Sequence, residues 1–192
     1  MGRDTVTIQP AKPAIFLDRD GVLNEAILRD GRPYPPFDLS ELVITNGARA
    51  ALKELKREGF LLIVVTNQPD VARGKTNRAN VAKINAQLAA ILPLDAIEVC
   101  KHDDNEQCDC RKPKPGLILR AREKLGADLA TSFMVGDRWR DIEAGRRAGC
   151  RTILIGDGYG ETFPSAPTIK FASLPEAASW ILQQRKRSRE IT

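Results

Sequence analysis

The sequence has no long hydrophobic run, and this absence excludes a helix that crosses a membrane. Its longest apolar run covers residues 60–65, whereas a span needs about 20 residues. No segment with the pattern of a secretory signal peptide precedes the first predicted strand. The start Met1-Gly2 lacks the Ser or Thr at position 6 that N-myristoylation favours, because Val6 stands there. We therefore expect a cytoplasmic protein with no membrane partner.

Aromatic residues are scarce, at 5%, and none is interleaved with the basic residues near the C-terminus. The net charge is +5, from 30 basic and 25 acidic residues. Four basic residues lie in the last eight positions: Arg185, Lys186, Arg187 and Arg189. Without them the net charge is 5 − 4 = +1. Because stacking aromatics are missing beside these charges, we expect a solvated tail over residues 185–192 and disfavour nucleic acid as a partner.

Internal repeats and low-complexity linkers are also absent, which favours one domain. With 192 residues, 42% of them hydrophobic, the chain can bury a substantial core. We expect this domain over residues 13–184, after a flexible segment at 1–12. The sequence does not determine the oligomeric state, and we favour a monomer.

Strand-like and helix-like segments alternate along the domain. We expect strands near residues 13–18, 60–66, 96–100, 132–136, 151–155 and 169–171, and helices near 47–59, 77–92, 116–125, 139–148 and 175–184. Such alternation predicts an α/β fold with a three-layer, Rossmann-like parallel sheet and helices on both faces. Residues 21–46 are rich in Gly and Pro, so we expect an irregular excursion over the strand ends, with no large cap domain.

Carboxylates follow two of the predicted strands. Asp18 and Asp20 come directly after the first strand, and Asp137 and Asp141 follow the fourth. If these strands are neighbours, the carboxylates meet and repel one another unless a divalent cation lies among them. Ligands that are all oxygens favour Mg²⁺. Alone, Asp18 and Asp20 fit a solvated acidic turn after a strand, and Asp141, more than Asp137, fits an acidic first turn of a helix.

Two further segments place polar or cationic groups near the same edge. Thr66, Asn67 and Gln68 end the second strand, where a hydroxyl and backbone N–H groups can bind phosphate oxygens. Arg111 and Lys112 lie on a proline-rich loop before a helix, and such cations neutralise a phosphoryl group in its transition state. Alone, the first segment is a common turn and the second is an ordinary surface loop.

The four segments together, residues 18–24, 66–68, 112–116 and 136–141, resemble the haloacid dehalogenase superfamily of phosphotransferases over about residues 14–157. The resemblance implies that Asp18 is the nucleophile, forms an aspartyl-phosphate and binds Mg²⁺. It implies that Asp20 is the general acid and then the base, and lends its backbone carbonyl to the metal. Asp137 is then a metal ligand, and Asp141 supports the ligands from outside the coordination sphere.

By the same resemblance, the second and third segments hold the phosphoryl group. Thr66 and Asn67 bind it, with Gln68 beside them, and Lys112 neutralises its charge. The activity implied is that of a phosphatase acting on a small phosphorylated metabolite.

The cysteines point to a second metal. Cys100, His102, Cys108 and Cys110 form the pattern Cys-x-His-x5-Cys-x-Cys. Three thiolates and one imidazole make the closed tetrahedral set of structural Zn²⁺. Reduced cysteines without a metal are the alternative, and Cys150 fits a small core residue. A zinc ion here would fix the polar loop and position Arg111 and Lys112, which follow it.

Within the superfamily, the zinc loop and residues 18–24 and 66–74 resemble the D-glycero-D-manno-heptose 1,7-bisphosphate 7-phosphatases and their relatives, the histidinol-phosphate phosphatases. This likeness implies that Arg111 and Arg138 contact the substrate and that Arg73 faces the pocket mouth. Pro69-Asp70 replaces the usual Ser-Gly, and the short gap between His102 and Cys108 resembles the histidinol-phosphate group.

The sequence therefore favours removal of the 7-phosphate from heptose 1,7-bisphosphate, with histidinol phosphate as the alternative substrate. A DNA 3′-phosphatase and a non-catalytic phospholigand-binding protein are the alternatives from other classes.

Overall fold

The computed structural model describes residues 11–190. Most of the expected flexible segment 1–12 lies outside this range, and the first strand begins at Lys12. The main sheet contains β1 (Lys12–Leu17), β4 (Leu61–Asn67), β5 (Ala96–Cys100), β6 (Ala127–Gly136), β7 (Arg151–Ile155) and β8 (Ile169–Phe171). The long helices are α1 (Ala48–Arg57), α2 (Arg78–Ile91), α3 (Gly116–Leu125), α4 (Trp139–Ala148) and α5 (Leu174–Glu190).

The strand order is β5-β4-β1-β6-β7-β8, and all neighbouring strands in this sheet are parallel. The predicted α/β class with a parallel sheet is confirmed. β1 lies between β4 and β6, with Leu17 in register with Val64 on one side and Val135 on the other. The carboxyl ends of these three strands therefore meet at one edge of the sheet, where ligands bind in folds of this kind.

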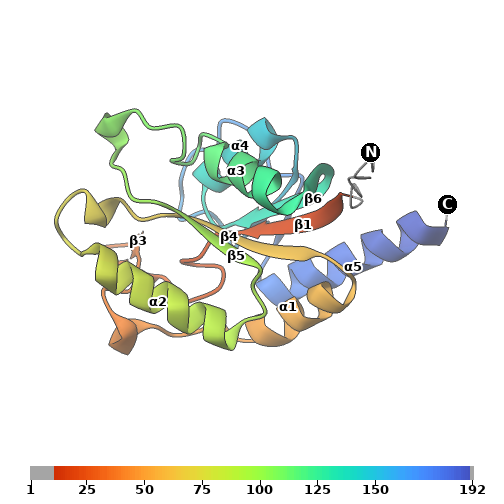
Figure 1. Ribbon diagram of the computed structural model, residues 1–192, viewed down its shortest axis with the longest axis horizontal. Helices are drawn as coiled ribbons and strands as arrows, with labels where there is room; N and C mark the ends of the chain where they lie inside the picture. Colours follow the sequence, from red (N-terminus) through yellow and green to blue (C-terminus); the bar gives the residue numbers. More distant parts are fainter. Residues whose placement is uncertain (1–10, 191–192) are drawn as a thin grey trace, which may run out of the picture.

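The helices cover both faces of the sheet (Figure 1). Helices α3 and α4 lie on one face, and α1, α2 and α5 lie on the other. Alternation along β1 sends Phe16 into the core beneath α3 and α4, and sends Ile15 and Leu17 into the opposite core. The site at the strand ends is thus held by a sheet buried on both sides.

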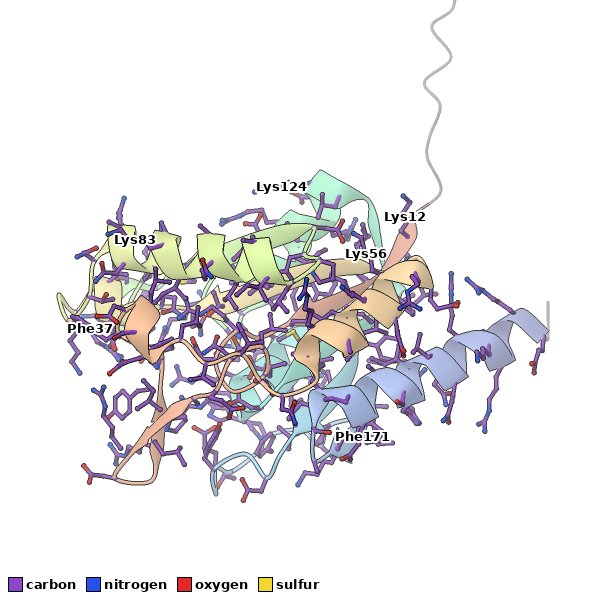
Figure 2. The ribbon with its side chains drawn as sticks, turned by 90° about the horizontal axis from the view of Figure 1, so that it is seen from below. Lys12, Phe37, Lys56, Lys83, Lys124 and Phe171 are labelled. Carbon is purple, nitrogen blue, oxygen red and sulfur yellow. The ribbon has the colours of Figure 1, made fainter. Side chains whose placement is uncertain are left out.

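The excursion after β1 contains more structure than expected. Ile27–Arg29 (β2) and Arg32–Tyr34 (β3) form an antiparallel hairpin, followed by a 3-10 turn, η1 (Leu39–Glu41). Asp30 and Gly31 join the strands with φ of 50° and 72°, as a tight hairpin turn requires. Figure 2 shows Phe37 on the other side of the molecule from Lys12, the first residue of β1, and the hairpin residues Arg32 and Tyr34 line the same cleft as Asp18. The excursion therefore lies at the carboxyl ends of the strands.

Two other boundaries differ from the sequence prediction. β6 begins at Ala127 instead of near residue 132. A shift in register between Pro13 and Ile15 lets Ala127 pair with Lys12, so pairing starts before the expected strand. α5 was expected to end near Gln184 and continues to Glu190. The basic residues Arg185, Lys186, Arg187 and Arg189 therefore lie on this helix, and Arg189 pairs with Glu58 over 2.7 Å.

Within residues 11–190, none of the helices combines the length and apolar character that crossing a bilayer needs. The cytoplasmic location and the monomeric state stay predictions.

Candidate active site

A cluster of three buried carboxylates lies at the edge where β1 and β6 end. Candidate ligand oxygens of Asp18, Asp137 and Asp141 all lie within 4.8 Å of one another. The Nζ atom of Lys112 lies 2.8 Å from Oδ1 of Asp18 and 2.5 Å from Oδ1 of Asp141. Asp18 and Asp137 meet because their strands are neighbours, as the sequence argument required. Lys112 reaches the cluster from the loop before α3.

Glycines allow these side chains to approach so closely. Gly21 has φ of +85°, and a Cβ there would lie 1.9 Å from Oδ2 of Asp137. A Cβ on Gly136 would lie 2.4 Å from Cγ of Asp141. Contacts below 3 Å to side chains in the cluster require a glycine at both positions.

The cluster carries more negative charge than its one lysine neutralises. Burial raises the pKa of Asp18 to about 7, although Lys112 acts to lower it. Burial also raises the pKa of Asp137 well above its ordinary value, with repulsion from Asp18 and Asp141 adding to the effect. Burial alone would lower the pKa of Lys112, but the charges of Asp141 and Asp18 raise it, so this lysine stays protonated. With all four groups ionised, three carboxylates and one ammonium give a formal charge of −3 + 1 = −2.

Asp137 has a free oxygen that fits a cation. Its Oδ2 accepts a hydrogen bond from the Tyr159 hydroxyl over 2.8 Å, whereas its buried Oδ1 has no partner within residues 11–190. An unpaired buried carboxylate oxygen is costly unless a ligand binds it. With a net charge of −2 around it, the oxygen set suits one divalent cation. Tyr159 lies in the loop after β7 and belongs to no motif, so its contact with Asp137 was not predicted from the sequence.

The Asp20 carboxylate is fixed by four hydrogen bonds. Arg19 donates from Nε to Oδ1 and from Nη2 to Oδ2, both over 3.0 Å. Gln68 donates to Oδ2 over 2.8 Å and Asn24 to Oδ1 over 3.1 Å. The Arg19 side chain is 0% exposed and donates onward to Asn85 on α2 over 3.0 Å. Arg19 was not among the predicted site residues, although its position between the carboxylates of Asp18 and Asp20 was an available signal.

Thr66, Asn67 and Gln68, at the end of β4, each make different hydrogen bonds. Thr66 is fully buried, and its hydroxyl accepts a hydrogen bond from Gln68 over 2.9 Å. Gln68 thus links Thr66 to Asp20. The Asn67 amide donates to the Lys112 carbonyl over 3.0 Å and accepts from the Lys112 N–H over 3.1 Å. In this structure these side chains hold Asp20 and Lys112 in place.

The four predicted zinc ligands converge on one point. Nδ1 of His102 lies 3.3 Å from Sγ of Cys110 and 3.6 Å from Sγ of Cys100. Sγ of Cys108 lies 3.7 Å from Cys100 and 3.5 Å from Cys110. Zinc–sulfur bonds of about 2.3 Å imply ligand–ligand separations of about 3.8 Å in a tetrahedron. The group could therefore hold a tetrahedral zinc ion.

A cleft of about 480 Å³ opens beside the cluster. Its wall includes Asp18, Asp20, Asn67, Lys112 and Asp141, and the hairpin residues Arg32 and Tyr34. The predicted substrate contacts Arg73, Arg111 and Arg138 also line it, whereas the lining does not include Thr66 or Gln68. Arg138 is already paired with Glu161, with 3.0 Å between Nε and Oε1. Charged side chains make up most of the cleft lining, and the three predicted arginines are part of it.

This arrangement can perform phosphoryl transfer. Within residues 11–190, Oδ2 of Asp18 has no hydrogen-bond partner, while its Oδ1 accepts from the Arg19 N–H over 2.7 Å. A carboxylate held at one oxygen and free at the other is a suitable nucleophile. Asp20 lies two residues away on the same loop, and the Lys112 amine supplies positive charge at the other oxygen of Asp18, Oδ1, over 2.8 Å.

Comparison with known proteins identifies similar phosphatases. A model of the HAD-hydrolase-like family matches residues 109–176. The D-glycero-β-D-manno-heptose-1,7-bisphosphate 7-phosphatase of Vibrio cholerae is 34% identical over 191 residues, covering 92% of this chain and 100% of the relative. The enzyme of the same name from Escherichia coli K12 is 37% identical over 183 residues, covering 88% of each chain.

Solved structures of similar fold include two heptose bisphosphate phosphatases. The D,D-heptose 1,7-bisphosphate phosphatase of B. bronchiseptica, solved with magnesium and phosphate, has a TM-score of 0.77 at 30% identity and covers 90% of this chain and 99% of its own. The enzyme of that name from Burkholderia thailandensis has a TM-score of 0.61 at 26% identity, with coverages of 89% and 99%.

Proposed function

The chain belongs to the HAD-like hydrolase family and is a phosphatase, and from this premise we propose that it removes the 7-phosphate from a heptose 1,7-bisphosphate. The observation that most directly supports phosphoryl transfer is the contact of Lys112 with both Asp18 and Asp141. It places a buried, protonated amine beside a carboxylate that has one free oxygen. The names of the relatives support the choice of sugar.

In the first step, Oδ2 of Asp18 attacks the phosphorus atom of the substrate. A bond forms between Asp18 and phosphorus while the bond from phosphorus to the sugar oxygen breaks. Asp20 gives its proton to the departing sugar oxygen. Lys112 lies against Asp18 and neutralises negative charge on the phosphoryl oxygens. The products of this step are the free hydroxyl of the sugar and an aspartyl-phosphate.

In the second step, water attacks the phosphorus of the aspartyl-phosphate. Asp20, now ionised, accepts a proton from this water, and the bond between Asp18 and phosphorus breaks. Inorganic phosphate leaves and Asp18 is a carboxylate again. The hydrogen bonds from Arg19, Gln68 and Asn24 hold Asp20 in one orientation through both steps.

Two metal ions complete the proposal. Asp18, Asp137 and the backbone carbonyl of Asp20 would hold Mg²⁺, with Asp141 positioning Lys112 next to them. When bound, Mg²⁺ offsets the charge of the carboxylates and of the phosphoryl oxygens. Cys100, His102, Cys108 and Cys110 would hold a structural Zn²⁺.

The cleft supports a small substrate over an oligonucleotide. Within residues 11–190 no cap domain covers the cleft, and its volume of about 480 Å³ suits a sugar phosphate. The basic end of α5 lies at the opposite end of the molecule from β3, which lines the cleft (Figure 1). Those basic residues therefore do not extend the cleft into a nucleic-acid groove.

A phosphate-release assay with Mg²⁺ tests the substrate. We expect heptose 1,7-bisphosphate to exceed histidinol phosphate, other sugar phosphates and a 3′-phosphorylated oligonucleotide by at least about 100-fold in kcat/KM. A similar preference for histidinol phosphate would instead assign the chain to that alternative. A preference for the oligonucleotide, weakened steeply by salt, would contradict the proposed class of substrate.

A further inference from the structure

Three arginines from separate segments converge on one carboxylate in the wall of the cleft. Asp104 accepts from Nε of Arg111 over 2.8 Å and from Nη1 of Arg140 over 3.0 Å, both at Oδ1. Nη2 of Arg73 lies 3.4 Å from its Oδ2. All four residues line the cleft, and the Asp104 side chain is 56% exposed. An acidic side chain thus occupies the point where the guanidinium groups meet.

Each nitrogen of the Arg73 guanidinium contacts a protein carboxylate. It donates from Nε to Oδ2 of Asp103 over 2.9 Å and from Nη2 to Oδ1 over 2.5 Å, and Nη1 lies 3.5 Å from Asp70. The other two arginines keep free donors. Within the described residues, Nη2 of Arg111 and Nη2 of Arg140 have no protein acceptor, and the buried Nε of Arg140 has none either.

Local charge is balanced in this part of the cleft. Three arginines (Arg73, Arg111, Arg140) and three aspartates (Asp70, Asp103, Asp104) give 3 − 3 = 0. A phosphate dianion placed beside the free donors would bring more charge and more acceptor oxygens than the Asp104 carboxylate offers. The carboxylate and the phosphate cannot both occupy the convergence point without repelling each other.

We propose that Asp104 is an internal competitor for the second phosphate of the substrate, and that Arg111 and Arg140 bind this phosphate once it displaces the Asp104 carboxylate. The inference rests on the proposed function, because it requires a substrate with two phosphates. It makes Asp104 a specificity-determining residue, since a ligand with one phosphate leaves the carboxylate in place. Asp104 can turn away locally, because it is the exposed first residue of a single 3-10 turn (Asp104–Glu106).

The substitution Asp104→Asn tests this role. The amide removes the negative charge and keeps an oxygen that can accept from Arg111 and Arg140. We expect the ratio of kcat/KM for heptose 1,7-bisphosphate over heptose 7-phosphate to rise about fivefold, the scale of one exposed ion pair. The matched control is Asp109→Asn in the same loop, whose side chain is 98% exposed and pairs only with Lys114. The control should keep the wild-type ratio.

A fall in this ratio in Asp104→Asn would overturn the inference, because the Asp104 carboxylate would then be needed to hold the arginines in position for the second phosphate. An unchanged ratio, or an equal rise in Asp109→Asn, would also overturn it. If heptose 1,7-bisphosphate is not hydrolysed at all, the proposed function fails, and a binding measurement still decides the role of Asp104.

That measurement uses calorimetry with glucose 1,6-bisphosphate and glucose 6-phosphate on protein carrying Asp18→Asn, so that hydrolysis does not interfere. Adding Asp104→Asn should raise the preference for the bisphosphate about fivefold. A preference that is unchanged or reduced contradicts the inference, whatever the natural sugar is.

Discussion

The side-chain amide of Asn67 hydrogen-bonds to both backbone groups of Lys112, donating to its carbonyl over 3.0 Å and accepting from its N–H over 3.1 Å. This pair ties the end of β4 to the loop that carries the lysine. The lysine amine then reaches Asp18 and Asp141. Asn67 therefore fixes the position of Lys112 relative to the nucleophile.

Replacing Asn67 with Ala should lower kcat about 10- to 100-fold, because a small displacement of a charged group at the reaction centre has an effect of this size. KM should change much less. Steady-state kinetics on the preferred phosphate ester measures both. Asn46→Ala, at an exposed position, is the control and should behave like wild type. Wild-type kcat in Asn67→Ala would show that the loop holds Lys112 without the amide.

Arg19 should be needed for both stability and activity. Arg19→Met leaves the Asp20 carboxylate without its buried cationic partner, and we expect the free energy of unfolding to fall by about 3 kcal/mol. Arg19→Lys keeps the charge but cannot bond both oxygens of Asp20 at once. It should recover most of the stability while kcat stays at least about tenfold low. Urea unfolding and kinetics on both variants check this, and full activity in Arg19→Lys would refute the positioning role.

The sequence predicted the parts of this site that short local patterns define. A buried strand followed by Asp18 and Asp20 indicated the edge of the sheet, and the spacing of the cysteines and His102 indicated a cluster that the structure brings together. That β1 and β6 are adjacent in the sheet could be stated only as a condition, because strand order depends on packing that no local pattern encodes. The structure supplies that order.

Residues that act through long-range contacts were not predictable in the same way. Tyr159 reaches Asp137 from a loop 22 positions further along the chain. The hydrogen bonds of the Asn67 amide to Lys112 were not predicted, because they join segments 45 positions apart; its contact with the phosphoryl group stays a prediction. The pair Asp30-Gly31 favours a tight hairpin turn, but the prolines around it led to the prediction of an irregular segment. The helix beyond Gln184 depends on contacts such as that of Arg189 with Glu58.

Gly21→Ala should remove activity. The new Cβ would lie 1.9 Å from Oδ2 of Asp137, and that carboxylate would have to move away from Asp18. We expect kcat/KM to fall by at least about 100-fold. Gly74→Ala is a matched control, because Gly74 also has a positive φ, +68°, but has open space where its Cβ would lie. Equal losses in the two variants would mean that backbone strain, and not displacement of Asp137, is responsible.

The cysteine cluster should contain zinc. Elemental analysis of purified protein should find about one zinc per chain. Cys108→Ala should lose the zinc and most of the activity, since the loop then no longer fixes Arg111 and Lys112. Cys150→Ala, at a core position outside the cluster, should keep both. Wild-type protein without zinc, or Cys108→Ala with full zinc, would contradict the assignment.

The most direct test of the mechanism is to find where the phosphoryl group goes. Wild-type protein mixed with its preferred substrate and Mg²⁺, quenched within one turnover and digested, should yield a peptide that carries one phosphoryl group on Asp18 by mass spectrometry. Asp18→Asn should show no such peptide and no phosphate release while its circular dichroism stays that of wild type. A phosphoryl group on another residue, or full phosphate release from Asp18→Asn, would contradict the assignment of Asp18 as the nucleophile.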